Sequence, residues 1–186
     1  MIVARPTKIS REGALQIAQR EAFVPIAYED GWHDPKIKKR PKYSIGFGDN
    51  LAKKGDTIEM KEAFERFNLA LALRTEIILK KVKVDLTQQQ LDALGSLFYQ
   101  GGNLKLDPMA RLLNAGDYDG AAALFLDDKM ATNKDGEFRQ GLKKRREREH
   151  AIFTKGDYGD IGWVWKYSGN PADGHRERYD VKDNEL

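Results

Sequence analysis

Three side chains in the first quarter of the chain could together carry out acid and base chemistry. Glu21 ends the segment REGALQIAQRE, Asp30 ends IAYED, and Ser44 lies in YSIGFG. Cleavage of a glycosidic bond requires one carboxyl group that protonates the leaving oxygen and a second group that holds water or attacks the anomeric carbon. Each residue alone is also typical of a solvated helix end, a turn or a bulged strand, but their joint order favours a glycosidase.

Glu21 lies at the end of a predicted helix with an apolar face. Ser10 can cap this helix, and apolar residues recur at intervals of three and four up to Ala22. A general acid must keep its proton near neutral pH, and burial away from water favours the protonated form of a carboxyl group. Glu21 follows Ile17 and Ala18 along the helix and is therefore the best placed candidate for the acid.

The second candidate region is the strand around Ser44. Alternation in YSIGFG places the large side chains on one face and leaves Ser44, Gly46 and Gly48 on the other. A face so poor in side chains weakens a strand unless something must approach its backbone closely. A sugar ring is a ligand that could approach in this way, and Ser44 would be the one side chain that faces it before the turn.

The elements that position these residues begin with a small β-lobe. IAYED and YSIGF have the composition of short strands and are separated by the loop GWHDPKIKKRPK. Asp56 with Glu59 forms a possible capping box before a long helical segment through FERFNLALALRTEIILKKV.

Helical patterns then fill the second half of the chain. Thr87 with Gln90 is a second capping box, and Asp107 followed by Pro108 has the pattern of an N-cap with proline at the first helical position. Further helical patterns occur in DYDGAAALFLDD and QGLKKRREREHAIF. We therefore predict an α+β fold in which a long helix joins a small β-lobe to a helical lobe.

We expect residues 1–155 to form one domain of two lobes. Residues 156–186 show no sustained period, which predicts an irregular C-terminal extension that packs on this domain or trails from it. Trp163 and Trp165 alternate along a possible strand of this extension, where they could stack on sugars or anchor it to the core.

Composition excludes several kinds of site. The 186 residues contain no cysteine, so disulfides, zinc thiolates and cysteine nucleophiles are excluded. His33, His150 and His175 lack metal-ligand spacing, and we expect no metal and no cofactor.

The net charge of +3 favours an anionic partner. The N-terminal residues lack the apolar stretch of a signal peptide, which predicts synthesis in the cytoplasm.

With these motifs in order, the sequence resembles the phage-type lysozymes of glycoside hydrolase family 24, which include the T-even phage enzyme. That family has a Glu, then an Asp in a Tyr-x-Asp strand nine residues later, then a Thr followed by Ile-Gly-x-Gly. Glu21, Tyr28-Glu29-Asp30 and Ser44-Ile45-Gly46-Phe47-Gly48 match this pattern. The resemblance continues in LTQQQLDALGSLFYQGG, LLNAGDYDGAAALF and GLKKRREREHAIF, and it covers residues 10–155.

The resemblance implies a muramidase that cleaves the β-1,4 bond between N-acetylmuramic acid and N-acetylglucosamine with inversion and without a cofactor. Glu21 would be the general acid, and Asp30 and Ser44 would hold the attacking water. It also implies positioning of Glu21 by Arg145 and Arg148, although solvated helix-surface arginines are an equally good interpretation. The residues implied to bind substrate are Tyr28, Gly46, Gly48, Tyr99 and Gln100.

Four positions depart from the family pattern. Ser44 replaces the usual Thr, which keeps the hydroxyl but loses the methyl group that restricts its rotamer. Asp30 and Ser44 are farther apart than in the family, so the loop between them includes an insertion. Asp49 stands where the family has His, and Tyr99 stands where it has Asn or Gln.

The inserted loop is basic over residues 36–42, which suggests contact with an anionic outer-membrane surface. A merely solvated loop is an equally good interpretation. We expect peptidoglycan as the partner, no specific nucleic acid and a monomer. The site of action would be the periplasmic cell wall, reached after release by a holin or as a virion component.

Two alternatives to a muramidase stay open at the level of sequence. A non-hydrolytic wall-binding or virion structural module could keep the fold, but the presence of both Glu21 and Asp30 favours an enzyme. A lytic transglycosylase needs one carboxylate and yields an anhydro sugar. Asp30 together with the hydroxyl of Ser44 favours a route through water.

Overall fold

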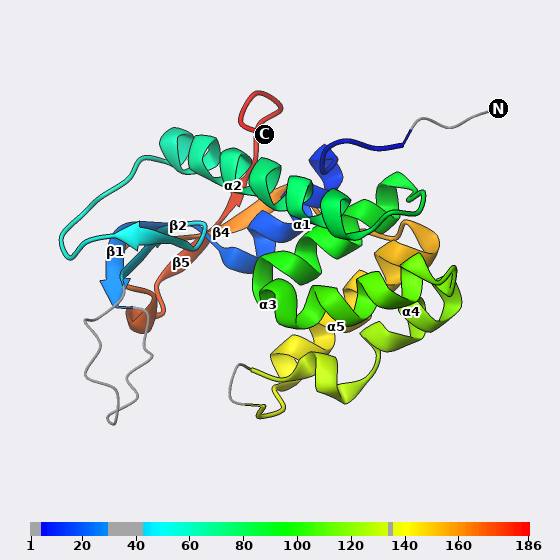
Figure 1. Cartoon of the computed structure of the whole chain (residues 1–186). Helices are drawn as coiled ribbons and strands as arrows, with labels where there is room; N and C mark the ends of the chain where they lie inside the picture. The colour runs from blue at the N-terminus through cyan, green and yellow to red at the C-terminus, as the bar shows by residue number, and fades with distance from the viewer. Residues whose placement is uncertain (1–4, 30–42, 134–135) are drawn as a thin grey trace. The chain divides into compact units, whose positions relative to one another are not determined.

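The computed structural model describes residues 5–29, 43–133 and 136–186, and it has the predicted α+β composition (Figure 1). Its elements are α1 (Arg11–Glu21), β1 (Val24–Glu29), β2 (Tyr43–Gly46), β3 (Asp49–Ala52), α2 (Met60–Lys81), α3 (Gln88–Asn114), α4 (Tyr118–Phe125), η1 (Asp128–Ala131), α5 (Gln140–Lys155), β4 (Trp163–Tyr167), η2 (Pro171–Asp173) and β5 (Arg176–Asp180). None of the described helices is long and apolar enough to cross a membrane.

The chain divides into two compact units. The helical unit comprises residues 1–14 and 71–160, and the β unit comprises residues 15–70 and 161–186. The boundaries fall inside α1 and inside the long helix α2, so each of these helices contributes residues to both units. The C-terminal residues beyond Asp160 return to the unit that contains Glu21 and Ser44.

The helical unit is built on mutual packing of α3, α4 and α5 (Figure 1). Its core is almost entirely aliphatic and aromatic, and several of its side chains are fully buried, among them Ile78, Leu91, Leu94, Leu97, Leu106, Met109, Leu113 and Phe125. The rings of Phe125 and Phe153 lie 5.5 Å apart and join α4 to α5. Burial of each such side chain contributes about 1.5–3 kcal/mol to folding.

The capping signals of this unit are confirmed in part. Thr87 and Gln90 form the predicted capping box at the start of α3. Asp107, predicted as an N-cap, does not start a helix and instead binds Lys81 through its carboxylate. The expected start was wrong because α3 resumes directly after a kink at Gly102, where φ is 56°, and Pro108 lies inside the helix.

In the β unit, β1, β2 and β3 form an antiparallel sheet in that order. Its apolar centre is Phe47, whose ring lies 5.8 Å from Phe23, 4.7 Å from Phe64 and 5.3 Å from Phe67. Such tilted aromatic pairs add about 0.5–1.5 kcal/mol each beyond the area they bury. Phe47, which the alternation placed on the face opposite Ser44, is thus part of the core of this unit.

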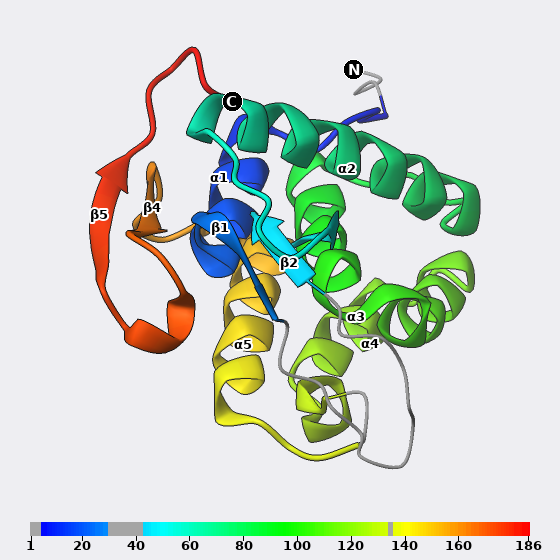
Figure 2. The ribbon, with the colours of Figure 1, turned by 90° about the vertical axis from the view of Figure 1, so that its left-hand side faces the viewer.

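The segment expected to be irregular contains an antiparallel hairpin of β4 and β5, visible at the C-terminal end of the chain in Figure 2. Val164 is fully buried, whereas Trp163 and Trp165 are partly exposed. Arg178 lies over the ring of Trp163 and Arg176 over that of Trp165, at 4.9 and 4.4 Å from the ring centres. Stacking of arginines on tryptophans thus stabilises a strand whose RERYD sequence has little β propensity.

Of the helix caps predicted at the starts of α1 and α2, the first is confirmed and the second is wrong. Ser10 caps α1 as predicted, because its Oγ accepts a hydrogen bond from the N–H of Gly13 at 3.0 Å. The capping box of Asp56 and Glu59 is wrong. The carboxylate of Asp56 accepts from the N–H of Lys53, so it closes the preceding turn, and α2 begins only at Met60.

Candidate active site

Glu21 is the last residue of α1 and is partly buried. The next residue, Ala22, has a φ of 60°, and no other non-glycine residue of the described chain has a positive φ. This left-handed turn ends the helix and sends the chain into β1, although Ala22 still donates its N–H to the carbonyl of Ala18 at 3.0 Å. Glu21 therefore stands where the backbone changes direction abruptly.

The turn between β2 and β3 lies beside the carboxylate of Glu21. Gly48 has a φ of 83°, and a Cβ atom at this position would lie 3.6 Å from Oε2 of Glu21. Glycine suits the position because it adopts positive φ without strain and adds no side chain next to the carboxylate. Two candidates from separate motifs, Glu21 and Gly48, are thus neighbours.

Ser44 lies on β2 directly opposite Tyr28 of β1. Ser44 is only 2% exposed, so the strand face predicted to be bare is buried at this residue. Tyr28 is partly buried beside it. The sheet register therefore brings together Ser44 and Tyr28, two further residues of the predicted site.

Gly46 has a packing role that the sequence pattern did not indicate. A Cβ atom at Gly46 would lie 3.3 Å from the Cβ of Ala63, closer than ordinary van der Waals contact. The missing side chain lets the N-terminal part of α2 approach the sheet. Its assignment to substrate binding stays a prediction.

Asp30, the predicted partner of Glu21, and the basic segment 36–42 lie outside the described residues. Asp49, which replaces the family's His, has a defined partner in the β unit. Its carboxylate accepts from Nη1 of Arg66 at 3.0 Å, and this bond is the main cause that raises the pKa of Arg66. The substitution at Asp49 thus gives an ion pair on the surface of the sheet.

Arg145 is 7% exposed and lies in a buried network of the helical unit. It donates through Nε to Glu149 at 3.3 Å and through Nη2 to the carbonyl of Ser96 at 3.1 Å. Arg146 binds the same carboxylate from Nη2 at 2.8 Å, and Ser96 donates its hydroxyl to it at 2.7 Å. Arg145 is thus a buried network residue and not a solvated one.

Arg148, the second predicted positioning residue, has contacts near the end of α5. Its Nη1 lies 3.2 Å from the carboxylate of Asp157, and its guanidinium packs against Gly159. Asp157 is exposed, so this ion pair contributes little stability. The orienting roles predicted for Arg145 and Arg148 stay predictions.

Tyr99 and Gln100 lie on α3 in the helical unit. The guanidinium of Arg74 stacks over the ring of Tyr99 at 4.3 Å from its centre. The side-chain oxygen of Gln100 is buried and has no hydrogen-bond partner among the described residues. Gln100 therefore keeps an acceptor that the fold does not satisfy, which is consistent with its predicted role in substrate binding.

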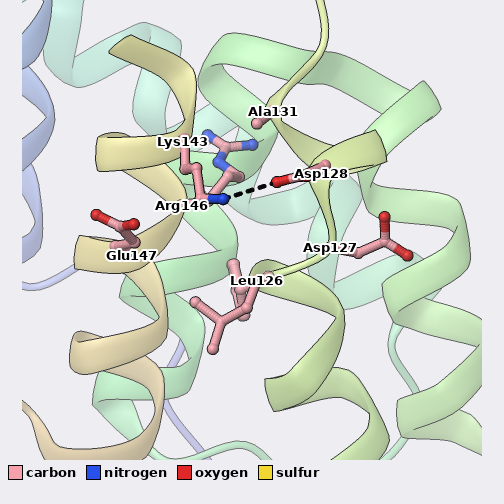
Figure 3. Close-up of a pocket in the computed structure, with 8 residues that line it drawn as sticks. Leu126, Asp127, Asp128, Ala131, Lys143, Arg146 and Glu147 are labelled. Atoms are coloured by element: carbon pink, nitrogen blue, oxygen red, sulfur yellow. Dashed lines mark hydrogen bonds and ion pairs between the residues drawn. The ribbon is translucent and has the colours of Figure 1, made fainter. Parts of the chain in front are cut away.

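A cavity of about 270 Å³ in the helical unit is lined by residues that are not among these candidates (Figure 3). Its charged lining residues are Asp127, Asp128, Lys143, Arg146 and Glu147. Lys143 binds Asp128 at 2.9 Å, and Asp127 points away from Arg146 in the figure. Burial lowers the pKa of Arg146 to about 10, and its charge is balanced by Glu149, whose carboxylate lies 2.8 Å from its Nε.

We assign no catalysis to this cavity, because both of its cations are engaged, Lys143 by Asp128 and Arg146 by Glu149. A metal site is also not indicated. Among residues 5–29, 43–133 and 136–186, no group of three His, Cys, Asp or Glu side chains is arranged to hold a metal ion.

Two features beside the site carried no signal in the sequence. One is the positive φ of Ala22, because alanine is not a residue that favours this conformation. The other is a bridge from Phe23 to β4, in which Phe23 pairs with Lys166 in parallel. Both depend on contacts between distant parts of the chain, which no local pattern reports.

Comparisons with known proteins identify several chains that resemble this one. The phage lysozyme profile matches residues 16–149. An endolysin of Acyrthosiphon pisum secondary endosymbiont phage 1 is 34% identical over 152 residues, which is 78% of this chain and 97% of that protein.

Solved structures show the same likeness. The muramidase domain of SpmX from Asticaccaulis excentricus superposes with a TM-score of 0.68 at 25% identity, over 80% of this chain and 98% of that domain. An endolysin from Escherichia coli O157:H7 phage FAHEc1 gives a TM-score of 0.64 at 28% identity, over 82% of this chain and 97% of that protein. With the profile covering most of its length, the chain belongs to the phage lysozyme family.

Proposed function

We propose that this protein is a muramidase that hydrolyses the β-1,4 bond between N-acetylmuramic acid and N-acetylglucosamine in bacterial peptidoglycan. The observation that carries the proposal is the position of Glu21, a partly buried carboxyl group at the end of α1 with Gly48 beside its Oε2. Membership of the phage lysozyme family supports the reaction class and the polymer. The bond within the polymer and the role of each residue are inferences.

In the proposed reaction, Glu21 donates its proton to the oxygen that leaves the anomeric carbon. Asp30 accepts a proton from a water molecule that the hydroxyl of Ser44 helps to orient. That water attacks the anomeric carbon from the opposite face, so the product has the inverted configuration. Glu21 ends the reaction ionised and Asp30 protonated, and proton exchange with solvent restores both.

The small residues around Glu21 serve this reaction by leaving space for the sugar. Gly48 adds no side chain of its own beside the Glu21 carboxylate, and the sheet register sets Tyr28 beside Ser44. We propose that Tyr28, Gly46, Gly48, Tyr99 and Gln100 bind the glycan. Arg145 and Arg148 are proposed positioning residues for the acid.

We also propose a membrane contact, an oligomeric state and a site of action for this protein. The basic segment 36–42 would contact an anionic outer-membrane surface, and the protein would act as a monomer. It would be made in the host cytoplasm and would reach the periplasmic wall after holin release or as part of a virion.

The test is clearing of permeabilised Gram-negative cells by the wild type, Glu21→Gln and Glu12→Gln, with mass spectrometry of the released sugars. Glu12 is an exposed glutamate of the same helix and provides a matched control. We expect Glu21→Gln to lower kcat by at least about 10²-fold, in line with loss of a positioned acid, and Glu12→Gln to clear like the wild type.

The released sugars distinguish the alternatives. Reducing-end muropeptides are expected for hydrolysis, whereas anhydro ends would assign the protein to the lytic transglycosylases. Binding to the wall without any released sugar would overturn the proposal in favour of a non-hydrolytic wall-binding module.

A further inference from the structure

The C-terminal hairpin is attached to the backbone immediately after Glu21. Phe23 donates its N–H to the carbonyl of Trp165 at 2.7 Å, and Tyr167 donates its N–H to the carbonyl of Phe23 at 2.9 Å. Both polar groups of Phe23 are thus satisfied by β4, two residues after the proposed acid. We name this pair of hydrogen bonds the β4 bridge.

The β4 bridge fixes a segment that would not hold its conformation alone. Ala22, between Glu21 and Phe23, adopts a φ of 60°, which disfavours residues with a Cβ atom. Such strained backbone conformations persist where contacts with the surrounding structure hold them in place. Phe23 is 2% exposed, so its N–H and carbonyl would lack partners if the bridge were lost.

The hairpin is anchored firmly enough to act as a fixed support. Val164 is fully buried between two residues that carry stacked arginines, Trp163 and Trp165. β4 pairs along its whole length with β5, from Trp163 opposite Asp180 to Tyr167 opposite Arg176. One edge of β4 therefore faces β5, and the other edge carries the bridge to Phe23.

The phage lysozyme profile ends at residue 149, and the hairpin lies beyond it. We infer that the hairpin is a positioning element of the catalytic unit: through the β4 bridge, Tyr167 and Trp165 hold the turn at Ala22 and so set the direction of the Glu21 carboxyl group. The inference rests on the proposed role of Glu21 as the acid. It gives the C-terminal segment a part in catalysis instead of only wall binding or virion docking.

The test separates the backbone donor of Tyr167 from its side chain. Tyr167→Pro removes the N–H that binds Phe23, whereas Tyr167→Ala removes the same ring and keeps that N–H. Proline is tolerated here because this N–H lies off the β4–β5 ladder and the preceding residue, Lys166, is already extended.

We expect Tyr167→Pro to have a kcat about 10- to 100-fold below that of Tyr167→Ala on solubilised peptidoglycan strands, since small displacements of a catalytic group have costs of this size. KM should stay within about twofold, because the glycan contacts are kept. The pH at which kcat falls on its alkaline side should also move in Tyr167→Pro. Equal kcat values and pH profiles for the two folded variants would overturn the inference.

Amide hydrogen exchange of the wild type provides a second test that needs no variant. The N–H groups of Phe23 and Tyr167 should exchange as slowly as those of the sheet strands, while Gly55, in an open turn, exchanges fast. Fast exchange at Phe23 or Tyr167 would overturn the inference even if Tyr167→Pro failed to fold. Retained activity in Glu21→Gln would instead refute the proposed function and leave the exchange result valid.

Discussion

Glu149 of the helical unit and Glu21 of the β unit are both glutamates on helices, yet their surroundings differ. Glu149 is fully buried, and its carboxylate receives hydrogen bonds from Ser96, Arg145 and Arg146. Glu21 is partly buried at a helix end beside Gly48. The first carboxylate is enclosed by three hydrogen-bond donors, and the second lies beside a turn glycine at the end of its helix.

The two units therefore use backbone and side chains differently. In the helical unit, regular helices bury an aliphatic core and a closed polar network, so its polar residues specify the fold. In the β unit, unusual backbone at Ala22 and Gly48 sets the position of one carboxyl group. A carboxylate available for proton transfer is expected in the second setting and not in the first.

The largest expected effect concerns the enclosed carboxylate. Glu149→Gln removes the negative charge that balances Arg145 and Arg146 and should lower the free energy of unfolding by about 3–5 kcal/mol, because it leaves buried cations without a counter-charge. Glu147→Gln, at an exposed position of the same helix, should change it by no more than about 0.5 kcal/mol. Urea denaturation measures both. Equal stability of the two variants would contradict the view that Glu149 is structural.

Much of the helical unit could be predicted from the sequence because its signals are local. The capping box of Thr87 and Gln90 and the apolar periods of α4 and α5 are complete within a few turns of helix. The restart of the helix was misplaced at Asp107, because Asp followed by Pro is a common N-cap pattern, whereas α3 kinks at Gly102 and continues through Pro108. Asp56 was misassigned because the same side chain can cap a helix or a turn.

The site could be predicted only where its residues lie in short motifs. Glu21, Ser44 and Gly48 are predicted in this way, and the structure sets Gly48 beside Glu21 and Tyr28 opposite Ser44. The β4 bridge joins Phe23 to residues near the other end of the chain, so no spacing reveals it. β5 was missed because charged residues have low strand propensity, and their stacking on tryptophans is a tertiary contact.

An intermediate effect is expected at Asp92, a second enclosed carboxylate of the helical unit. Tyr158 donates its hydroxyl to Asp92 at 2.6 Å, and Asp92 also accepts from the N–H of Ser10 at 2.8 Å. Tyr158→Phe removes a hydrogen bond to a charged group and should lower the free energy of unfolding by about 1.5–3 kcal/mol at neutral pH.

This bond also predicts a pH dependence. Burial, followed by the bond to Asp92, raises the pKa of Tyr158 in the folded protein. As the pH rises above about 10, Tyr158 ionises in the unfolded chain but stays protonated in the folded one, so its stabilisation is lost progressively. Tyr179, whose pKa is raised to about 12 by its bond to Glu185, contributes equally to both proteins. The stability difference between wild type and Tyr158→Phe should therefore shrink above pH 10, and a constant difference would contradict this account.

The smallest expected effect on stability is the most informative about the β unit, because two glycines there both have a positive φ and differ in their neighbours. Gly48 and Gly55 have φ values of 83° and 90°, but only Gly48 would place a Cβ atom next to Glu21, whereas nothing lies within 4 Å of one at Gly55. Gly48→Ala and Gly55→Ala should each lower the free energy of unfolding by about 1–2 kcal/mol, the cost of a left-handed residue with a Cβ atom.

The two variants should differ in turnover. The methyl group in Gly48→Ala contacts the carboxyl group that transfers the proton and should lower kcat about tenfold, whereas Gly55→Ala should keep the kcat of the wild type. Thermal unfolding and kcat on the same preparations measure both quantities. A similar loss of kcat in both variants would mean that turnover follows the stability of the β unit, and the different surroundings of Glu149 and Glu21 would then have no bearing on catalysis. A loss of kcat in Gly48→Ala alone would show that turnover depends on the position next to Glu21, because both alanine variants introduce a Cβ atom at a positive φ.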